Sequence, residues 1–290
     1  MGPQARPLLA ILLLAALSLT GCGVARRVAI SEMVPVLECS VEAIYRDLDV
    51  ETVGLGIPSN LLLLRGLCET DPSNRDLWAL TIQLYFYYGV GYVEDEDPER
   101  AKLVYAQGLS LGRRALERRR WITPFDDADA FQERLRKLDR DDVPLLFWTL
   151  ANWTKWIGEN LDKPSALADL PLVEVALERV LELDGDYFRG MPHLMRGTLE
   201  SSKPVLTGGR PEIARDQFEQ AFAISDRKLL IFHVFYAQYY CRQQLDEEGF
   251  EAALREVLEA SPDLEPDFRL LNEVARRKAA ALMEQKDDFF

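Results

Sequence analysis

The hydrophobic pattern of the chain has a helical period. From Arg26 onward, apolar residues recur at intervals of three and four, which places them on one face of an α-helix. Alternating β-branched residues, the pattern typical of strands, are nearly absent. The sequence therefore predicts an all-α fold. The expected helices cover, within a few residues at each end, 27–47, 59–70, 75–92, 98–118, 142–160, 170–183, 192–203, 211–224, 227–244, 247–260 and 266–285.

Prolines mark where two of these helices begin. Pro98 follows the acidic run 94–97, and Pro211 follows a Gly-Gly pair. A proline in the first turn loses no helical hydrogen bond, and the helix dipole favours carboxylates at that end. We therefore expect helix starts at both prolines.

Four of the expected helices carry an apolar stripe at positions i, i+4 and i+7, which often reads small, large, small. The stripes are Ala101, Tyr105 and Gly108; Val173, Leu177 and Val180; Ala214, Phe218 and Ala221; and Phe250, Leu254 and Val257. Small residues let a partner helix approach while the large one fills its groove. The last two intervals between stripes, 41 and 36 residues, are near the tetratricopeptide period of about 34. We predict about four tetratricopeptide-like hairpins with extra N- and C-terminal helices; an unrelated helical bundle is the alternative.

The first interval between stripes is longer and contains a charged segment near 119–142. We expect this segment to be an insertion on the rim of one helical domain that covers residues 22–290. The domain would thus have no second folded unit.

Residues 1–21 have the features of a lipoprotein signal peptide. Residues 8–19 form an apolar stretch shorter than the roughly 20 residues that a membrane-spanning helix needs, and Leu19-Thr20-Gly21-Cys22 follows at once. This tetrad resembles a bacterial lipobox, so we expect Cys22 to carry acyl chains such as palmitate; an ordinary signal peptide with a chance cysteine is the alternative. Gly23, in place of an aspartate, favours the outer membrane over the inner, with the domain on the periplasmic side.

Charge and cysteine content narrow the set of partners. With 48 acidic and 34 basic residues the net charge is −14, which repels nucleic acid and anionic headgroups, so we expect no nucleic-acid partner and membrane contact through the anchor only. The remaining cysteines, Cys39, Cys68 and Cys241, have no C-x-x-C spacing. We expect three buried structural thiols, with a Cys39–Cys68 disulfide as the alternative, and neither a metal nor a cofactor.

Catalytic motifs are missing from the sequence. It contains no G-x-S-x-G and no H-E-x-x-H, and Gly208-Gly209-Arg210 lacks the lysine and hydroxyl of a phosphate loop. His193 and His233 each have apolar neighbours, which favours a hydrogen-bonded structural histidine over a ligand or general base. We expect a protein that is not an enzyme.

Aromatic residues are concentrated on the helices expected to face the concave side of the array. Most would form core, yet several amphipathic rings together with an amide and an imidazole could line an internal pore with a few polar anchors. The candidate pore-lining residues are Tyr85, Tyr88, Trp148, Asn152, Trp153, Trp156, His193, Tyr236 and Tyr239.

Several stretches, in this order and spacing, resemble the T component of tripartite ATP-independent periplasmic (TRAP) transporters. They are Phe147-Trp148-Thr149 with Asn152-Trp153; Leu170 to Val173 and Glu178 to Asp184; His193 and Gly197; Gly208 to Pro211 with Ala214 to Phe218; and Leu270-Leu271-Asn272. The resemblance runs from about residue 58 to 284, and the segment 48–57 departs from the family pattern.

The resemblance implies a periplasmic lipoprotein that assembles as a homotrimer, partners the TRAP solute-binding protein and holds a small hydrophobic ligand in an internal pore. Two other interpretations stay open. One is a non-catalytic scaffold lipoprotein of the outer membrane with a solid core, and the other is an unrecognised enzyme. An opening inside the folded chain would separate the first two.

Overall fold

The chain folds into α-helices, as its pattern predicts. The computed structural model describes residues 5–119, 128–203 and 209–290, with side chains described from residue 25 on, and contains no strand within these ranges. None of the helices described there combines the length and the apolar character needed to cross a membrane. The expected all-α class is confirmed.

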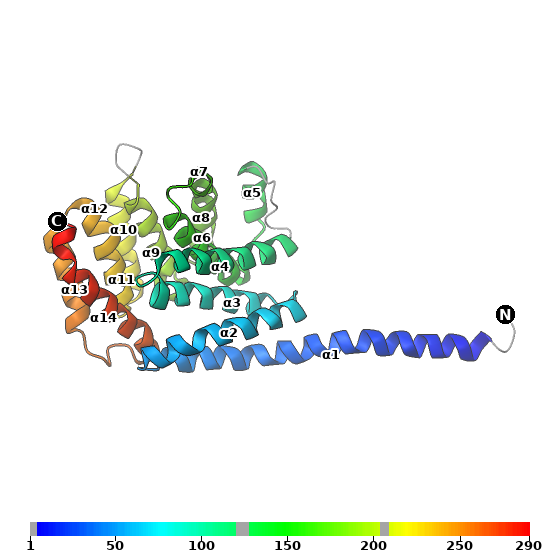
Figure 1. The fold of residues 1–290 in the computed structure, drawn as a ribbon. Coiled ribbons are helices and arrows are strands. Elements are labelled where there is room, and N and C mark those ends of the chain that lie inside the picture. The colour runs from blue at the N-terminus through cyan, green and yellow to red at the C-terminus, as the bar shows by residue number, and fades with distance from the viewer. Residues whose placement is uncertain (1–4, 120–127, 204–208) are drawn as a thin grey trace.

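Four helical hairpins form the body of the domain (Figure 1). In each, an inner helix packs against the outer helix that follows it, and the inner helices pack on one another from hairpin to hairpin. The pairs are α3 (Arg75–Tyr88) with α4 (Pro98–Arg118); α6 (Val143–Gly158) with α8 (Leu170–Asp184); α9 (Tyr187–Ser201) with α10 (Pro211–Ile224); and α11 (Leu230–Phe235), η4 (Tyr236–Cys241) and α12 (Arg242–Gln244) with α13 (Glu247–Glu259). This matches the predicted number of hairpins.

The four predicted stripes lie on the outer helices α4, α8, α10 and α13, and every residue in them is buried. Their small members permit close approach. A Cβ atom on Gly108 would lie 2.2 Å from Oδ1 of Asn152 on α6, and one on Gly112 would lie 2.4 Å from Oγ1 of Thr149. The α4 stripe, continued one turn further by Gly112, is therefore the seam along which the first hairpin stacks on α6 of the second.

The two ends of the chain meet. α14 (Arg269–Glu284) packs on α11 and α13 and also contacts α1 (Ala5–Tyr45) and α2 (Val50–Thr70). Figure 1 shows α1 and α2 side by side along one edge of the domain, with α14 reaching them from the C-terminal hairpin. The expected extra N-terminal helices thus lie beside α3, and the extra C-terminal helix α14 joins them to the last hairpin.

The starts of α1 and α2 differ from expectation. α1 is helical from Ala5 rather than from about residue 27. α2 begins at Val50, where the Asp49 carboxylate accepts a hydrogen bond from the Thr52 amide, and Pro58 lies within the helix rather than before it. α9 is assigned from Tyr187, but Phe188, Arg189 and Gly190 have left-handed φ and ψ values, so its regular helix begins after Gly190, close to the expected start at residue 192. Two segments, η1 (Gly89–Val93) and η4, are π-helical, which hydrophobic spacing does not reveal.

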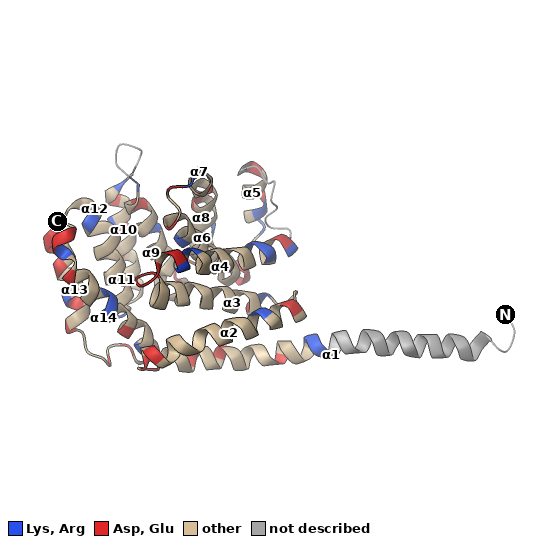
Figure 2. Ribbon diagram, viewed as in Figure 1, with Lys and Arg blue, Asp and Glu red and all other residues tan. Residues whose placement is uncertain are grey.

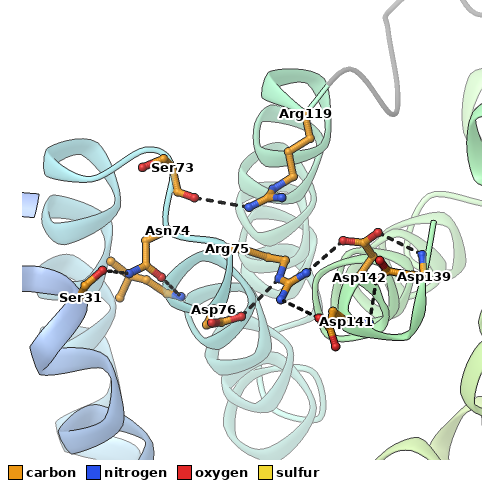
Figure 3. Close-up of polar contacts among 10 residues, drawn as sticks. Ser31, Ser73, Asn74, Arg75, Asp76, Arg119, Asp139, Asp141 and Asp142 are labelled. Atoms are coloured by element: carbon orange, nitrogen blue, oxygen red, sulfur yellow. Dashed lines mark hydrogen bonds and ion pairs between the residues drawn. The ribbon is translucent and has the colours of Figure 1, made fainter. Parts of the chain in front are cut away.

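The charged segment near 119–142 lies partly outside the described residues, which omit 120–127. Its described part forms α5 (Ala128–Leu135) and η2 (Arg140–Asp142). Figure 3 shows how the end of the segment attaches to α3: Arg75 Nη1 lies 3.1 Å from Asp142 Oδ1, and Arg75 Nη2 lies 3.9 Å from Asp141 Oδ2. On the other side of this helix start, Asn74 Nδ2 donates to the Ser31 hydroxyl of α1.

Acidic residues predominate along α13 and basic residues along α4 (Figure 2). Cys68 and Cys241 are buried free thiols, as expected. Cys39 is also free but exposed, so the expectation of three buried thiols is wrong for this one, because its side of α1 faces away from α2 and α14. The alternative disulfide between Cys39 and Cys68 is not formed.

Candidate functional site

A cavity of about 330 Å³ lies between the terminal helices and the first hairpin. Helices α1 and α2 form two of its walls, and α3, η1 and α14 form the remainder. Its apolar lining comes from Leu37, Val41, Ile44, Val53, Ile57, Leu63, Leu64, Leu80, Leu84, Val90, Leu270, Leu271 and Val274. This volume is at the lower end of the range of about 300–1,000 Å³ for small-molecule sites.

Glycines on α2 shape this cavity. A Cβ on Gly54 would lie 2.5 Å from the ring of Tyr92, so the Tyr92 ring occupies space that is free only because Gly54 has no side chain. Gly56 lines the cavity, and a Cβ there would meet nothing within 4 Å. The wall opposite is the π-helical η1, whose extra residue per turn places Val90, Gly91 and Tyr92 along the cavity.

Most polar groups of the lining are already hydrogen-bonded within the chain. The Ser40 hydroxyl donates to a backbone carbonyl of α1, the Thr52 hydroxyl to Asp49, and the Asn60 amide to the Gly56 carbonyl. The Tyr92 hydroxyl differs, since it is shielded from solvent and has no hydrogen-bond partner. Burial raises the pKa of Tyr92 to about 12, so the hydroxyl keeps its proton at neutral pH.

A second cavity, of about 50 Å³, lies among the inner helices. Its lining is Phe86, Phe147, Ala151, Thr154, Lys155, Met191, Leu194, Met195, Thr198, Phe235 and Tyr239. Lys155 is the charged residue of this set, and its Nζ lies 3.3 Å from the Tyr239 hydroxyl.

Lys155 belongs to a buried ion network that joins three distant segments. Glu94 Oε2 lies 2.5 Å from Lys155 Nζ of α6, and Glu94 Oε1 lies 2.9 Å from Lys278 Nζ of α14. The Tyr105 hydroxyl also donates to Glu94, and Asp95 contacts Lys278. Burial alone would raise the pKa of Glu94, but the two ammonium groups outweigh it and lower this pKa to about 2. The network therefore ties the first hairpin to the second and to the last helix.

The predicted pore residues lie mostly in solid packing. Tyr85, Trp148, Asn152 and Trp153 are buried, and of the nine only Tyr239 lines either of the two cavities. Their polar atoms mostly have partners within the chain. Tyr88 accepts from Arg100, Trp148 donates to Tyr187, Trp153 donates to Asp169, Asn152 donates to the Ile82 carbonyl, and His193 Nδ1 donates to Gln217.

Two other predicted pore residues, Tyr236 and Trp156, contact groups of the chain itself. Tyr236 stacks on Tyr240 with ring centroids 5.1 Å apart. The Trp156 side chain is half-buried, and its carbonyl accepts from Asn160. Ligand contact by any of the nine residues stays a prediction.

Several of the aromatic residues form one cluster between the N-terminal layer and the inner helices. Its members are Tyr45, Phe86, Tyr87, Phe147, Trp148, Tyr187, Phe188 and Phe268. Tyr45 and Tyr87 also line the larger cavity, so the cluster forms one end of it. Phe188 reaches this position with a φ of 45°, a left-handed conformation uncommon for a bulky residue.

No sequence pattern indicated the larger cavity directly, because ordinary leucine, valine and isoleucine residues line it. The one usable feature is the pair of glycines, Gly54 and Gly56, in the α2 interior, where glycine costs about 0.5–1 kcal/mol relative to alanine. A glycine in a helix interior suits a position where a neighbouring group approaches closely or where space is needed. Among the described residues, no three His, Cys, Asp or Glu side chains are grouped to hold a metal ion.

A closed array of helical hairpins around apolar cavities is the architecture of a binding and interaction protein. Residues 46–290 match the family model described as TRAP transporter T-component. The chain is also 25% identical over 266 residues to an uncharacterized protein of Treponema pallidum (strain Nichols), an alignment that covers 83% of this chain and 80% of the relative.

The chain belongs to the TRAP transporter T-component family. The resemblance found in the sequence motifs is thereby confirmed, and the match extends into the segment 48–57, where the motifs depart from the family pattern. Membership gives the chain an accessory role in TRAP transport and a periplasmic or membrane-associated location.

Proposed function

We propose that this protein is a non-catalytic, lipid-anchored T component that binds the TRAP solute-binding protein and holds a small hydrophobic ligand inside its helical array. The observation that carries the ligand part is the apolar cavity of about 330 Å³ among α1, α2, α3, η1 and α14. A cavity of this size and lining favours an apolar guest, since burial contributes about 25 cal/mol per Å² of apolar surface.

The scaffold interpretation requires a solid core. The cavity therefore favours the ligand-binding interpretation over the scaffold interpretation. The predicted aromatic anchors contribute less to the proposal, because most of these rings fill space between helices. A guest in the cavity would touch the first hairpin and both terminal helices at once. Binding there would therefore strengthen the contact between the two ends of the chain.

A pair of glycine substitutions on one helix tests the ligand site. Gly56→Leu places a side chain in the cavity, whereas Gly66→Leu lies on the same helix, also has open space around its Cβ and does not line the cavity. Both replace a helical glycine and gain helix propensity. We expect native mass spectrometry of the purified chain to show bound small molecules in wild type and Gly66→Leu, and to show their loss in Gly56→Leu.

Equal ligand content in all three proteins would remove the cavity as the site. The absence of bound molecules from wild type, together with unchanged stability on adding apolar compounds, would favour the scaffold interpretation instead.

Family membership supports a proposal for the partner and for the assembly. We propose that the outer surface binds the solute-binding protein and that the chain assembles as a homotrimer, anchored through acyl chains on Cys22 to the periplasmic face of the outer membrane. Co-purification under mild detergent tests the partner, and sedimentation velocity of the same sample tests the trimer. Recovery of the protein without a solute-binding protein, or as a monomer at micromolar concentration, would contradict the respective part.

A further inference from the structure

The larger cavity opens to solvent between α1 and α2. The lining residues that are also exposed mark its mouth, and they are Ser40, Asp47, Thr52, Asn60 and Leu63. All five belong to α1, to α2 or to the turn between them, whereas the lining residues of α3, η1 and α14 are buried or half-buried. A guest therefore enters between α1 and α2, at the edge of the domain that these helices form in Figure 1.

Large apolar side chains lie exposed on the two helices that border this mouth. They are Met33 and Val36 on α1 and Leu55, Leu62 and Leu63 on α2, and each is between 43% and 77% exposed. Single apolar residues on a surface are common, but a group of them beside an opening is typical of an interaction site. This edge of the domain therefore needs a partner that covers it.

The exposed residues of α1 share a helix face with the expected acylation site. Positions 22, 29, 33, 36, 40 and 43 are separated by three, four or seven residues, which places them on one side of a helix. From position 29 on they are Ala29, Met33, Val36, Ser40 and Ala43, all exposed and uncharged. The register of α1 thus puts the lipid anchor and the cavity mouth on the same side.

The charges along these helices suit a membrane surface. Residues 52–64 of α2 contain no charged side chain and are drawn in tan in Figure 2, and residues 25–37 of α1 contain two arginines and one glutamate. Arg65 lies at the same end as these arginines, whereas Asp47 and Asp49 lie at the far end, away from the anchor. Arginines near the anchor favour anionic headgroups, and an uncharged rim can approach acyl chains without burying a charge.

We propose that this side of the domain lies on the lipid bilayer beside the anchor, so that an apolar guest passes between the membrane and the cavity without crossing water. We call it the mouth face, and it consists of Met33, Val36, Ser40, Leu55, Leu62 and Leu63. The inference rests on the proposed function, since it needs acyl chains on Cys22 and an apolar guest. It adds contact by the folded domain to the expected membrane contact through the anchor only.

The position of the anchor favours the bilayer over a second copy of the chain as the occupant. A second copy packed on the mouth face would lie between the domain and the membrane that holds its anchor. The bilayer can cover the same apolar side chains while the anchor stays inserted.

The test uses the acylated full chain in vesicles of phosphatidylethanolamine and phosphatidylglycerol. A fluorophore is attached at Val36→Cys in a Cys39→Ser background, in which Cys68 and Cys241 are buried. If α1 stood upright, position 36 would lie about 21 Å from position 22 at about 1.5 Å per residue, so the label would stay in water. We expect brominated lipid to quench this label at least threefold more than a label at Leu103→Cys, an exposed site on α4.

A pair of charge substitutions tests the mouth face itself. Leu55→Glu with Leu62→Glu adds two carboxylates beside the mouth at positions that do not line the cavity. We expect this double variant to halve the lipid quenching of the Val36→Cys label or reduce it further, while the chain still floats with the vesicles. Leu103→Glu with Leu258→Glu, at exposed leucines of α4 and α13, is the matched control and should leave the quenching unchanged.

Three results would overturn the inference, and they are distinguishable. Equal, weak lipid quenching of the Val36→Cys and Leu103→Cys labels, with both quenched by aqueous iodide, would show that the mouth face lies in water. Shielding of the Val36→Cys label from iodide without lipid quenching would assign the face to a second copy. Both results leave the anchor and the ligand site in place, whereas a chain that does not float with vesicles would contradict the proposed anchor as well.

Discussion

Glu94 is the residue on which the closure of the array depends most directly. It lies between the ammonium groups of Lys155 and Lys278, and it accepts a third hydrogen bond from Tyr105. Removing one member of a buried ion pair leaves an uncompensated charge, which costs about 3–5 kcal/mol. The network therefore makes a large contribution only while it is complete.

We expect Glu94→Gln to lower the free energy of unfolding by about 3 kcal/mol, as measured by urea denaturation followed by circular dichroism. The double variant Glu94→Leu with Lys155→Met removes both charges of one pair and should recover part of the loss. A single variant as stable as wild type would show that the ions are solvated in solution.

The Glu94 carboxylate also predicts that the stability of the fold decreases at acidic pH. Its pKa in the folded chain, about 2, is below the ordinary value of 4.5, because Lys155 and Lys278 outweigh the effect of burial. A lowered pKa gives stability that is fully present above pH 4.5 and is lost as the pH falls toward 2. Thermal midpoints between pH 6 and about pH 3 should therefore fall more steeply for wild type than for Glu94→Gln.

At the scale of the helix, the glycines of the outer helices set how closely the hairpins stack. A Cβ on Gly112 of α4 would lie 2.4 Å from Thr149 Oγ1 of α6. We expect Gly112→Ala to lower stability by about 1–3 kcal/mol because α4 and α6 must separate. Gly158→Ala, on α6 with open space around its Cβ, is the control and should be neutral or slightly stabilising in the same denaturation assay. Equal effects of the two substitutions would mean that helix spacing adjusts freely.

Helices marked by local chemistry could be predicted closely from the sequence. Residue spacing and first-turn prolines placed α4 and α10 at their observed bounds, because Pro98 and Pro211 occupy the first helical position, where no helical hydrogen bond is lost. α2 was predicted too short, with a start at residue 59, whereas the helix begins at Val50 and contains Pro58 in its interior. The short α5 and α7 (Pro164–Ala168) were missed, since so few residues show no period.

The candidate site was less predictable than the helices, for a different physical reason. Aromatic residues mark a region of the fold, yet whether a ring lines a cavity or fills space depends on how separate helices meet. The larger cavity arises where α14 returns to α1 and α2, a contact between the two ends of the chain that no local pattern specifies. Tyr239 was in the predicted set and lines the smaller cavity, while Tyr92 was not and lines the larger one.

At the scale of the whole molecule, anchoring is a property of the extreme N-terminus. We expect Cys22→Ala to abolish the incorporation of an alkyne-labelled fatty acid into the protein, while the far-ultraviolet circular dichroism spectrum stays unchanged. Cys39→Ala is the matched control, because Cys39 is an exposed thiol on the same helix and should leave labelling intact. Persistent labelling of Cys22→Ala would place the acyl chains on another residue.

α1 carries the predicted lipidation site near its start and lines the larger cavity near its end, so it sets the distance between the membrane and the folded domain. The helix supplies Leu37, Val41 and Ile44 to the wall of the larger cavity, and its first buried side chain is Ile30. With acyl chains on Cys22, about eight residues would separate the bilayer from the folded body, a leash of about 12 Å if helical at about 1.5 Å per residue. If the cavity takes its ligand from the membrane, as we propose, such a short leash would limit how far the domain can move from the bilayer, so lengthening it by inserted residues should slow exchange with the bilayer without altering affinity.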